Sequence, residues 1–182
     1  TTRVYHCLGN RSDELHVSRE WEQLRLSRHE IMSTDRSKNI LIIRPSALGD
    51  VCRSVPLLSA LRAKHRDARI DWLVQDTFVG AIEHHPQLDH VIAFPRKALA
   101  KDIRKARFRP LIRWLRTLRS PKYDIVIDAQ GLLRSAFFAY ISGAKKRYGY
   151  RNAQELGWIF YTNRIEAPRS DHAVDRMLTL AA

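Results

Sequence analysis

The sequence predicts an α/β domain with a mostly parallel, Rossmann-like sheet flanked by helices, and two observations support this fold class. Short apolar runs rich in β-branched residues alternate along the chain with segments of helical period. Alternation of this kind implies right-handed βαβ crossovers. The chain has 182 residues, of which 45% are hydrophobic and 28% charged, and this is typical of a globular protein with one proper core.

The first predicted βα unit begins with a short apolar run at residues 40–44. Its composition, Ile-Leu-Ile-Ile-Arg, and the proline that ends it are typical of a buried strand. The loop at 45–49 follows, and we expect Asp50 to open a helix. Apolar residues spaced three and four apart would form the buried face of that helix: Val51, Val55, Leu57, Leu58 and Leu61.

Two further strands are predicted before the chain becomes strongly basic. Residues 69–74 and 90–94 have the composition of buried strands. Between them, Asp76 or Thr77 is expected to cap a short helix that runs through Glu83. These elements continue the alternation of strand and helix.

The charge of the protein is concentrated in one segment. Residues 96–122 contain eleven Lys or Arg and one acid, whereas residues 1–38 contain seven basic and six acidic residues, so the net charge of +13 is a local patch. Such a patch is either a solvated helix face or a site for nucleic acid, anionic lipid headgroups or an acidic substrate. Pro110 lies near the first turn of its main helix. The stripe that we expect to be buried comprises Phe108, Leu111, Ile112, Leu115 and Leu118.

The clearest strand is predicted at residues 124–128, Asp-Ile-Val-Ile-Asp. Gly131 then leads into an apolar helix at 132–141, with Ser142-Gly143 as its stop signal. Residues 146–150 are a candidate fifth strand. Ligands of parallel sheets bind beyond the carboxyl ends of the strands, so the loops after these strands are where a site is expected.

The chain divides into an N-terminal extension of unknown role at residues 1–37 and a Rossmann-like domain at 38–182. The final segment, from His172, reads as an amphipathic helix without Gly, Asn or Pro to end it. We therefore expect the chain to be truncated. No apolar run is long enough to span a membrane, and the N-terminus lacks the apolar core of a secretory signal.

Cysteine and histidine positions exclude some classes of site. Cys7 and Cys52 lie far apart and fit no metal-ligand spacing, so a reducing, cytoplasmic setting is expected. The pair His84-His85 has no third ligand nearby, so we predict no metal site.

The loop at Ser46-Ala-Leu-Gly-Asp50 follows a strand and opens a helix, where dinucleotide-binding proteins place several glycines. Here Gly49 is alone, and both the Gly-x-Gly-x-x-Gly pattern and the phosphate-loop Gly-Lys-Ser/Thr are absent. A conventional NAD site or nucleotide triphosphatase is therefore disfavoured. Asp50 either caps the helix or acts as a general base aimed into the cleft.

The second candidate loop is Asp128-Ala-Gln-Gly131, after the clearest strand. In one interpretation Asp128 caps a strand-to-helix turn in which Gly131 supplies an unusual backbone angle. In the other, Asp128 and Gln130 offer hydrogen bonds to a polyhydroxylated ligand.

Five segments, taken together and in this order, resemble one known family. They are Ile-Leu-Ile-Ile-Arg-Pro-Ser-Ala-Leu-Gly-Asp-Val at 40–51, Pro-Leu-Leu-Ser-Ala-Leu at 56–61, Ile-Asp-Trp-Leu-Val at 70–74, Tyr-Asp-Ile-Val-Ile-Asp-Ala-Gln-Gly-Leu at 123–132 with Arg-Ser-Ala at 134–136, and His-Ala-Val-Asp-Arg at 172–176. The family is that of the lipopolysaccharide heptosyltransferases, glycosyltransferase family 9, and the resemblance extends from about Lys38 to the C-terminus.

The resemblance implies a GT-B architecture, in which two Rossmann-like domains face each other across a cleft. The N-terminal domain binds the acceptor, the Kdo-lipid A inner core, and the C-terminal domain binds the donor, ADP-heptose. Asp50 matches the proposed catalytic base of an inverting displacement that uses no metal and no cofactor. Nothing in the chain resembles a donor domain, so we expect the chain alone to be inactive in lipopolysaccharide core biosynthesis.

The resemblance also suggests substrate contacts and a location. The loop residues implied are Ser46, Gly49, Asp128, Gln130 and Gly131. Basic residues between the third and fourth strands would hold the anionic acceptor at a membrane face, and they are Arg96, Lys97, Lys101, Arg104 and Lys105. We expect a cytoplasmic protein, peripheral to the inner membrane, that does not bind nucleic acid in its function. Two alternatives stay open: a basic nucleic-acid-binding module, and a related transferase that uses another nucleotide sugar.

Overall fold

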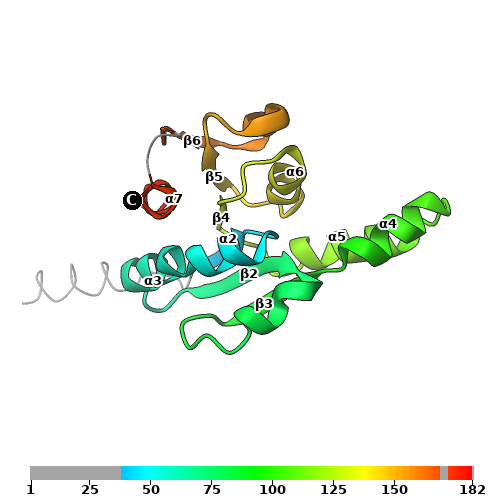
Figure 1. The fold of residues 1–182 in the computed structure, drawn as a ribbon, viewed down its shortest axis with the longest axis horizontal. Helices are drawn as coiled ribbons and strands as arrows, with labels where there is room; N and C mark the ends of the chain where they lie inside the picture. Colours follow the sequence, from blue (N-terminus) through cyan, green and yellow to red (C-terminus); the bar gives the residue numbers. More distant parts are fainter. Residues whose placement is uncertain (1–37, 169–171, 182) are drawn as a thin grey trace, which may run out of the picture. The chain divides into compact units, whose positions relative to one another are not determined.

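The computed structural model describes residues 38–168 and 172–181, which form a parallel sheet with helices on both faces (Figure 1). The sheet has six strands in the order β3-β2-β1-β4-β5-β6. All the pairings between them are parallel. The strands are β1 (Asn39–Ile43), β2 (Arg69–Gln75), β3 (His90–Phe94), β4 (Ile125–Asp128), β5 (Lys146–Tyr150) and β6 (Asn163–Ile165). The predicted fold class is confirmed, while the extension predicted at 1–37 lies outside the described residues.

The direction of the strand order reverses at β1. This strand pairs with β2 on one side and with β4 on the other, and Ile43 is in register with both Leu73 and Asp128. The carboxyl ends of β1 and β4 therefore lie next to each other, and the loops that follow them lead to opposite halves of the sheet. Such a switch point is where open parallel sheets hold their ligands.

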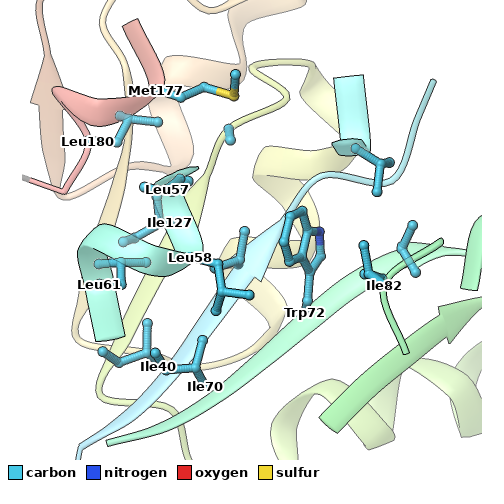
Figure 2. Close-up of a cluster of buried hydrophobic side chains, with 14 of the residues drawn as sticks. Ile40, Leu57, Leu58, Leu61, Ile70, Trp72, Ile82, Ile127, Met177 and Leu180 are labelled. Atoms are coloured by element: carbon cyan, nitrogen blue, oxygen red, sulfur yellow. The ribbon is translucent and has the colours of Figure 1, made fainter. Parts of the chain in front are cut away.

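One face of the sheet is covered by α2 (Leu48–Arg53), α3 (Val55–Lys64), the 3₁₀ helix η1 (Asp76–Ala81) and α7 (Ala173–Leu178). The apolar residues of α3 and α7 pack on those of the central strands, and Trp72 fills the middle of this cluster (Figure 2). The central strand β1 is buried on both faces, which is why its sequence is continuously apolar rather than alternating.

The other face is covered by α4 (Arg96–Arg104), α5 (Arg109–Arg119) and α6 (Leu133–Ile141), with η2 (Gln154–Phe160) packed on α6. The rings of Phe94, Trp114 and Phe138 lie 4.9 to 5.1 Å apart, centroid to centroid. The Trp114 indole also donates a hydrogen bond of 2.8 Å to the carbonyl of Ala93. This contact fixes α5 to the edge strand β3.

The helix predicted to open at Asp50 is in fact two helices. The first helix, α2, begins at Leu48, two residues earlier than predicted. It ends at its C-cap, Ser54, which is also the N-cap of α3. Pro56 lies in the first turn of α3 and has no backbone N–H, so it cannot extend a helix that comes from α2. The Ser54 hydroxyl lies 2.7 Å from the carbonyl of Asp50 and 3.0 Å from the sulfur of Met177.

The buried stripe predicted for the basic helix is wrong at two positions. Phe108 and Ile112 are 54% and 48% exposed, whereas Trp114 and Leu118 are buried. The cause is the indole hydrogen bond to β3, which turns the Trp114 side of α5 toward the sheet and the Ile112 side outward. The remaining stripe residues, Leu111 and Leu115, pack at the margin of the core.

Three elements were not predicted from the sequence: α4 as a separate helix, η2 and β6. The other strands agree with the predicted ranges to within one residue. In the part of the chain that the structure describes, no helix is long and apolar enough to cross a membrane.

Candidate active site

A cavity of about 230 Å³ lies at the switch point of the sheet. It is formed by the end of β1, the turn after β4, the segment after β5 and helix α7. Its lining has two arginines and no carboxylate: Arg44, Ala129, Gln130, Gly131, Leu132, Tyr150, Asn152, Ala153, Gln154, Ala173, Arg176 and Met177. The cavity is therefore polar and positively charged.

Arg44 connects three parts of this site. It directly follows β1, and its side chain is only 14% exposed. One guanidinium nitrogen lies 3.1 Å from the Asp50 carboxylate, and another donates a hydrogen bond to the carbonyl of Ala129. The arginine thus links the β1 strand end, the first turn of α2 and the turn after β4.

Asp50 is positioned by α2 but does not cap it. The N-cap is Ala47, no side chain makes a capping hydrogen bond, and Asp50 is the third residue of the helix. The capping interpretation is therefore wrong. The carboxylate lies in the first turn, where the helix dipole favours negative charge, and is 38% exposed beside Arg44. A carboxylate held in this way is oriented and accessible, as a general base must be.

The turn at Asp128–Gly131 has the structural role that one of the two interpretations gave it. Asp128 is fully buried, and one of its oxygens accepts backbone hydrogen bonds from Gln130 (2.8 Å) and Gly131 (3.2 Å). The other accepts a 2.7 Å hydrogen bond from the Tyr161 hydroxyl. Gly131 has a φ of +71°, which favours glycine. The prediction that Asp128 hydrogen-bonds a ligand directly is therefore wrong, because its carboxylate is fully buried and both oxygens accept hydrogen bonds from the protein.

Burial dominates the electrostatics of this turn. Desolvation raises the pKa of Asp128, and the hydrogen bonds from Tyr161, Ser135, Gln130 and Gly131 oppose the shift. The pKa of Tyr161 is raised by burial and then by the neighbouring Asp128 carboxylate. Together they hold the turn whose residues Gln130 and Gly131 line the cavity.

The two predicted loops do meet. The backbone N–H of Ser46 donates a hydrogen bond of 3.3 Å to the side-chain carbonyl of Gln130, and Gln130 and Gly131 both line the cavity. Ser46 is half-buried and Gly49 is exposed; neither lines the cavity. A methyl group at Gly49 would meet no atom within 4 Å, so no contact in the described structure requires glycine there.

Arg176 reaches the cavity from α7, at the far end of the described chain. Its guanidinium lies over the Tyr150 ring, 4.9 Å from the centroid. Arg44 and Arg176 each have a buried Nε atom that finds no hydrogen-bond partner among the described residues. Burial raises the pKa of Tyr150 to about 12, although the two arginines oppose the shift. Unsatisfied donors on two cavity arginines suit an anionic or hydroxyl-rich ligand.

The five predicted acceptor-binding cations lie on or next to α4, and all five are exposed. None of them lines the cavity. Arg96 is close enough to α6 to act on a charge there. The pKa of Arg134 on α6 is lowered first by burial and then by the charge of Arg96. The role of the five α4 cations in acceptor binding stays a prediction.

Sequence reasoning missed the five polar cavity residues outside the predicted loops: Arg44, Tyr150, Asn152, Gln154 and Arg176. Two of them had a usable signal. Arg44 ends the central strand directly before the candidate loop, and Arg176 closes the last of the five motif segments. In the described ranges, no group of three His, Cys, Asp or Glu side chains could hold a metal ion.

The fold is that of a Rossmann-like domain with a polar cavity at its switch point, and comparison with known proteins identifies its relatives. The family model of glycosyltransferase family 9 (heptosyltransferase) matches residues 111–182. Lipopolysaccharide heptosyltransferase 1 from Escherichia coli K12 is 30% identical over 151 residues, with 79% of this chain and 46% of the relative covered. The enzyme of that name from Pseudomonas aeruginosa is 32% identical over 150 residues, with 79% and 41% covered.

The fold is also similar to solved structures. Escherichia coli heptosyltransferase WaaC with ADP-2-deoxy-2-fluoro heptose has a TM-score of 0.69 and 27% identity, with 79% of this chain and 47% of that chain covered. Escherichia coli heptosyltransferase II, at a TM-score of 0.63 and 22% identity, supports the fold alone. The predicted resemblance to the heptosyltransferases is confirmed, and the chain spans less than half the length of the curated relatives it matches.

Proposed function

We propose that this chain forms the acceptor-binding half of a heptosyltransferase of lipopolysaccharide core biosynthesis. The whole enzyme would transfer heptose from ADP-heptose to the Kdo-lipid A inner core, with the donor bound by a second domain. One observation carries the proposal: the accessible Asp50 carboxylate is paired with Arg44 at the same sheet edge as a cavity lined by Arg44 and Arg176, each of which has one Nε without a hydrogen-bond partner among the described residues. The motif order and the relatives described above support it.

Asp50 acts as the general base in this mechanism. Its carboxylate takes the proton of the acceptor hydroxyl as that oxygen forms a bond to the anomeric carbon of heptose. The bond from the anomeric carbon to the β-phosphate oxygen breaks at the same time, and its electron pair leaves with ADP. A single displacement of this kind inverts the configuration at the anomeric carbon. Arg44 orients the carboxylate through the 3.1 Å ion pair.

The cavity supplies acceptor binding. Kdo carries a carboxylate, which matches the charge and the free donors of Arg44 and Arg176. Gln130, Asn152 and Gln154 line the same cavity and offer amide groups to sugar hydroxyls. The basic patch of α4 lies outside the cavity and suits the phosphates of lipid A. We place the enzyme in the cytoplasm, peripheral to the inner membrane where that acceptor is made.

The test is a chimera in which residues 38–182 replace the matched part of Escherichia coli lipopolysaccharide heptosyltransferase 1. We expect the chimera to release ADP and form the heptosylated product from ADP-heptose and Kdo-lipid A, and the 182-residue chain alone to do neither. Asp50→Asn should lower kcat by about 10²- to 10⁴-fold, because the general base is lost. Other nucleotide sugars, tested in parallel, determine whether heptose is the preferred donor.

The matched control is Asp67→Asn, which removes an exposed carboxylate from the turn between α3 and β2. Its kcat should stay within about twofold of the chimera, because surface changes of this kind leave stability within ±0.5 kcal/mol. Circular dichroism checks that both variants fold. Near-normal turnover in a folded Asp50→Asn chimera would remove Asp50 from the mechanism. A folded chimera that transfers no sugar, beside an active parent enzyme, would overturn the proposed function.

A further inference from the structure

The segment between β3 and β4 forms a helical hairpin whose tip carries an unusual surface. Helix α4 ends in a turn where Ala106 has a φ of +55°. Two backbone hydrogen bonds of 2.9 Å, from Ala106 to Ile103 and from Arg107 to Asp102, close this turn. They match the motif with which helices end before a sharp reversal. The tip therefore has a defined backbone geometry.

Three large apolar side chains lie exposed at this tip. They are Ile103, 42% exposed, Phe108, 54% exposed, and Ile112, 48% exposed. Phe108 and Ile112 are one helical turn apart, since the N–H of Ile112 donates to the carbonyl of Phe108 at 3.0 Å. They therefore share one face of α5. Exposed apolar groups that cluster in this way, rather than lying singly, mark a contact surface.

Exposed cations are interspersed along the chain with the three apolar residues. They are Lys101, Arg104, Lys105, Arg107, Arg109 and Arg113. Among the ion pairs that the described residues make with one another, none uses a cation from residues 96–122. Asp102 is the one acid in that range. The tip thus combines unpaired positive charge with exposed apolar side chains.

We propose that this tip docks on an anionic bilayer, with Ile103, Phe108 and Ile112 inserted below the headgroups. The interspersed cations then contact the lipid phosphates, as in other amphipathic elements that lie in a membrane interface. Duplex nucleic acid is the less favoured occupant, because a phosphate backbone satisfies the cations and leaves the apolar side chains in water. The inference rests on the proposed function in one respect only, the identity of the membrane that the tip binds.

The two contributions respond differently to salt. The attraction of cations to an anionic surface weakens within a Debye length of about 8 Å at physiological ionic strength. Burial of apolar side chains is not screened by salt. Binding through both should therefore fall with added salt but persist at physiological ionic strength.

The test is co-sedimentation of the full 182-residue chain with vesicles of phosphatidylcholine, with or without phosphatidylglycerol, at physiological salt. We expect binding to the phosphatidylglycerol vesicles and little to the neutral ones. The triple variant Ile103→Ser, Phe108→Ser and Ile112→Ser should lower the partition coefficient on the order of a hundredfold, or about 2.8 kcal/mol. The matched control, Leu48→Ser with Leu178→Ser, removes exposed leucines from the opposite helical layer and should change binding by less than about threefold.

Three outcomes would overturn the inference. They are absence of binding to phosphatidylglycerol vesicles, equal binding by the triple variant, and equal loss in the control variant. Sub-micromolar binding to duplex DNA at physiological salt, with displacement of the protein from vesicles, would assign the tip to nucleic acid instead. These vesicles contain no Kdo-lipid A, and the transfer assay uses detergent-dispersed acceptor, so either proposal can fail without the other.

Discussion

The helical layers on the two faces of the sheet bury similar apolar cores but present different surfaces. Helices α2, α3 and α7 with η1 carry four basic and three acidic residues, whereas α4, α5 and α6 with η2 carry nine and two. Of the ten exposed large apolar residues, eight lie on or next to the elements of the second layer. The cavity is bordered by α7 from the first layer and by Gln154, the first residue of η2, from the second. The two layers therefore differ mainly in charge and in exposed apolar area, while both contribute to the rim of the cavity.

The first prediction tests whether helix α5, in the second layer, has one buried and one exposed apolar side. Leu118→Ala should lower the free energy of unfolding by about 2–5 kcal/mol, because Leu118 is fully buried. Ile112→Ala, on the same helix, should change it by less than about 0.5 kcal/mol. Urea unfolding followed by circular dichroism measures both. Similar losses in the two variants would mean that Ile112 is covered in solution.

The second prediction concerns the packing of Gly149 against Tyr161, the hydrogen-bond partner of Asp128. Gly149→Ala would place a methyl carbon 2.3 Å from the Tyr161 ring, which is held in place by its hydrogen bond to Asp128. We expect a loss of about 2–3 kcal/mol in unfolding free energy. Gly49→Ala is the control, since its methyl group meets no atom within 4 Å. A thermal melt in which the two variants agree would show that Tyr161 moves freely.

The third prediction uses alkaline pH to compare the two cores. The pKa values of Tyr123 in the second core and Tyr150 in the first are raised above 10.0, mainly by burial. The folded state therefore holds these protons more tightly than the unfolded state does. Stability contributed by each phenol is complete below pH 10 and is lost as the pH rises through the folded pKa, by up to about 1.4 kcal/mol per pH unit.

Phenylalanine variants separate the two tyrosines in that titration. Either substitution should make the loss of stability above pH 10 less steep, as measured by urea unfolding. At neutral pH, Tyr123→Phe should also cost about 1–3 kcal/mol, because the buried Asp71 loses a 2.6 Å hydrogen bond. No hydrogen bond involves the Tyr150 hydroxyl within the described residues, so Tyr150→Phe should cost less. An unchanged slope in both variants would contradict the shared burial effect.

The smallest predicted effect concerns the hairpin tip. Ala106 has a positive φ that glycine adopts without steric cost, so Ala106→Gly should stabilise the chain by about 0.5–1 kcal/mol. Ala100→Gly, inside the preceding helix α4, should destabilise the chain by about 1 kcal/mol. Opposite signs in a urea titration are the expected result. Equal destabilisation would mean that the turn at Ala106 differs in solution.

Much of the fold was predictable from the sequence because strand signals are local. The continuous apolar runs at residues 40–44 and 124–128 identified buried strands without reference to any distant residue. Strand alternation then placed the Ser46–Asp50 loop and the Asp128–Gly131 turn at one edge of the sheet. The backbone hydrogen bond from Ser46 to Gln130 agrees with that prediction.

The remainder was decided by contacts between residues far apart in the chain. A helical period shows that α5 has an apolar side, but the bond from Trp114 to Ala93 decides that Phe108 and Ile112 face outward. Likewise, the sequence allowed Asp128 either to bind a ligand or to stabilise the turn. The hydrogen bond from the Tyr161 hydroxyl to its second oxygen shows the structural role.

The site itself shows the same division. The sequence by itself determined that a carboxylate, Asp50, would stand at the carboxyl edge of a parallel sheet, because strand composition and loop position are local properties. Only the tertiary structure placed Arg44 against that carboxylate and brought Arg176 to the same cavity from the end of the described chain. The physical reason is that the long arginine side chain pairs with any carboxylate that the folded backbone brings within a few ångströms. That distance depends on how distant segments pack, so it cannot be predicted from local sequence.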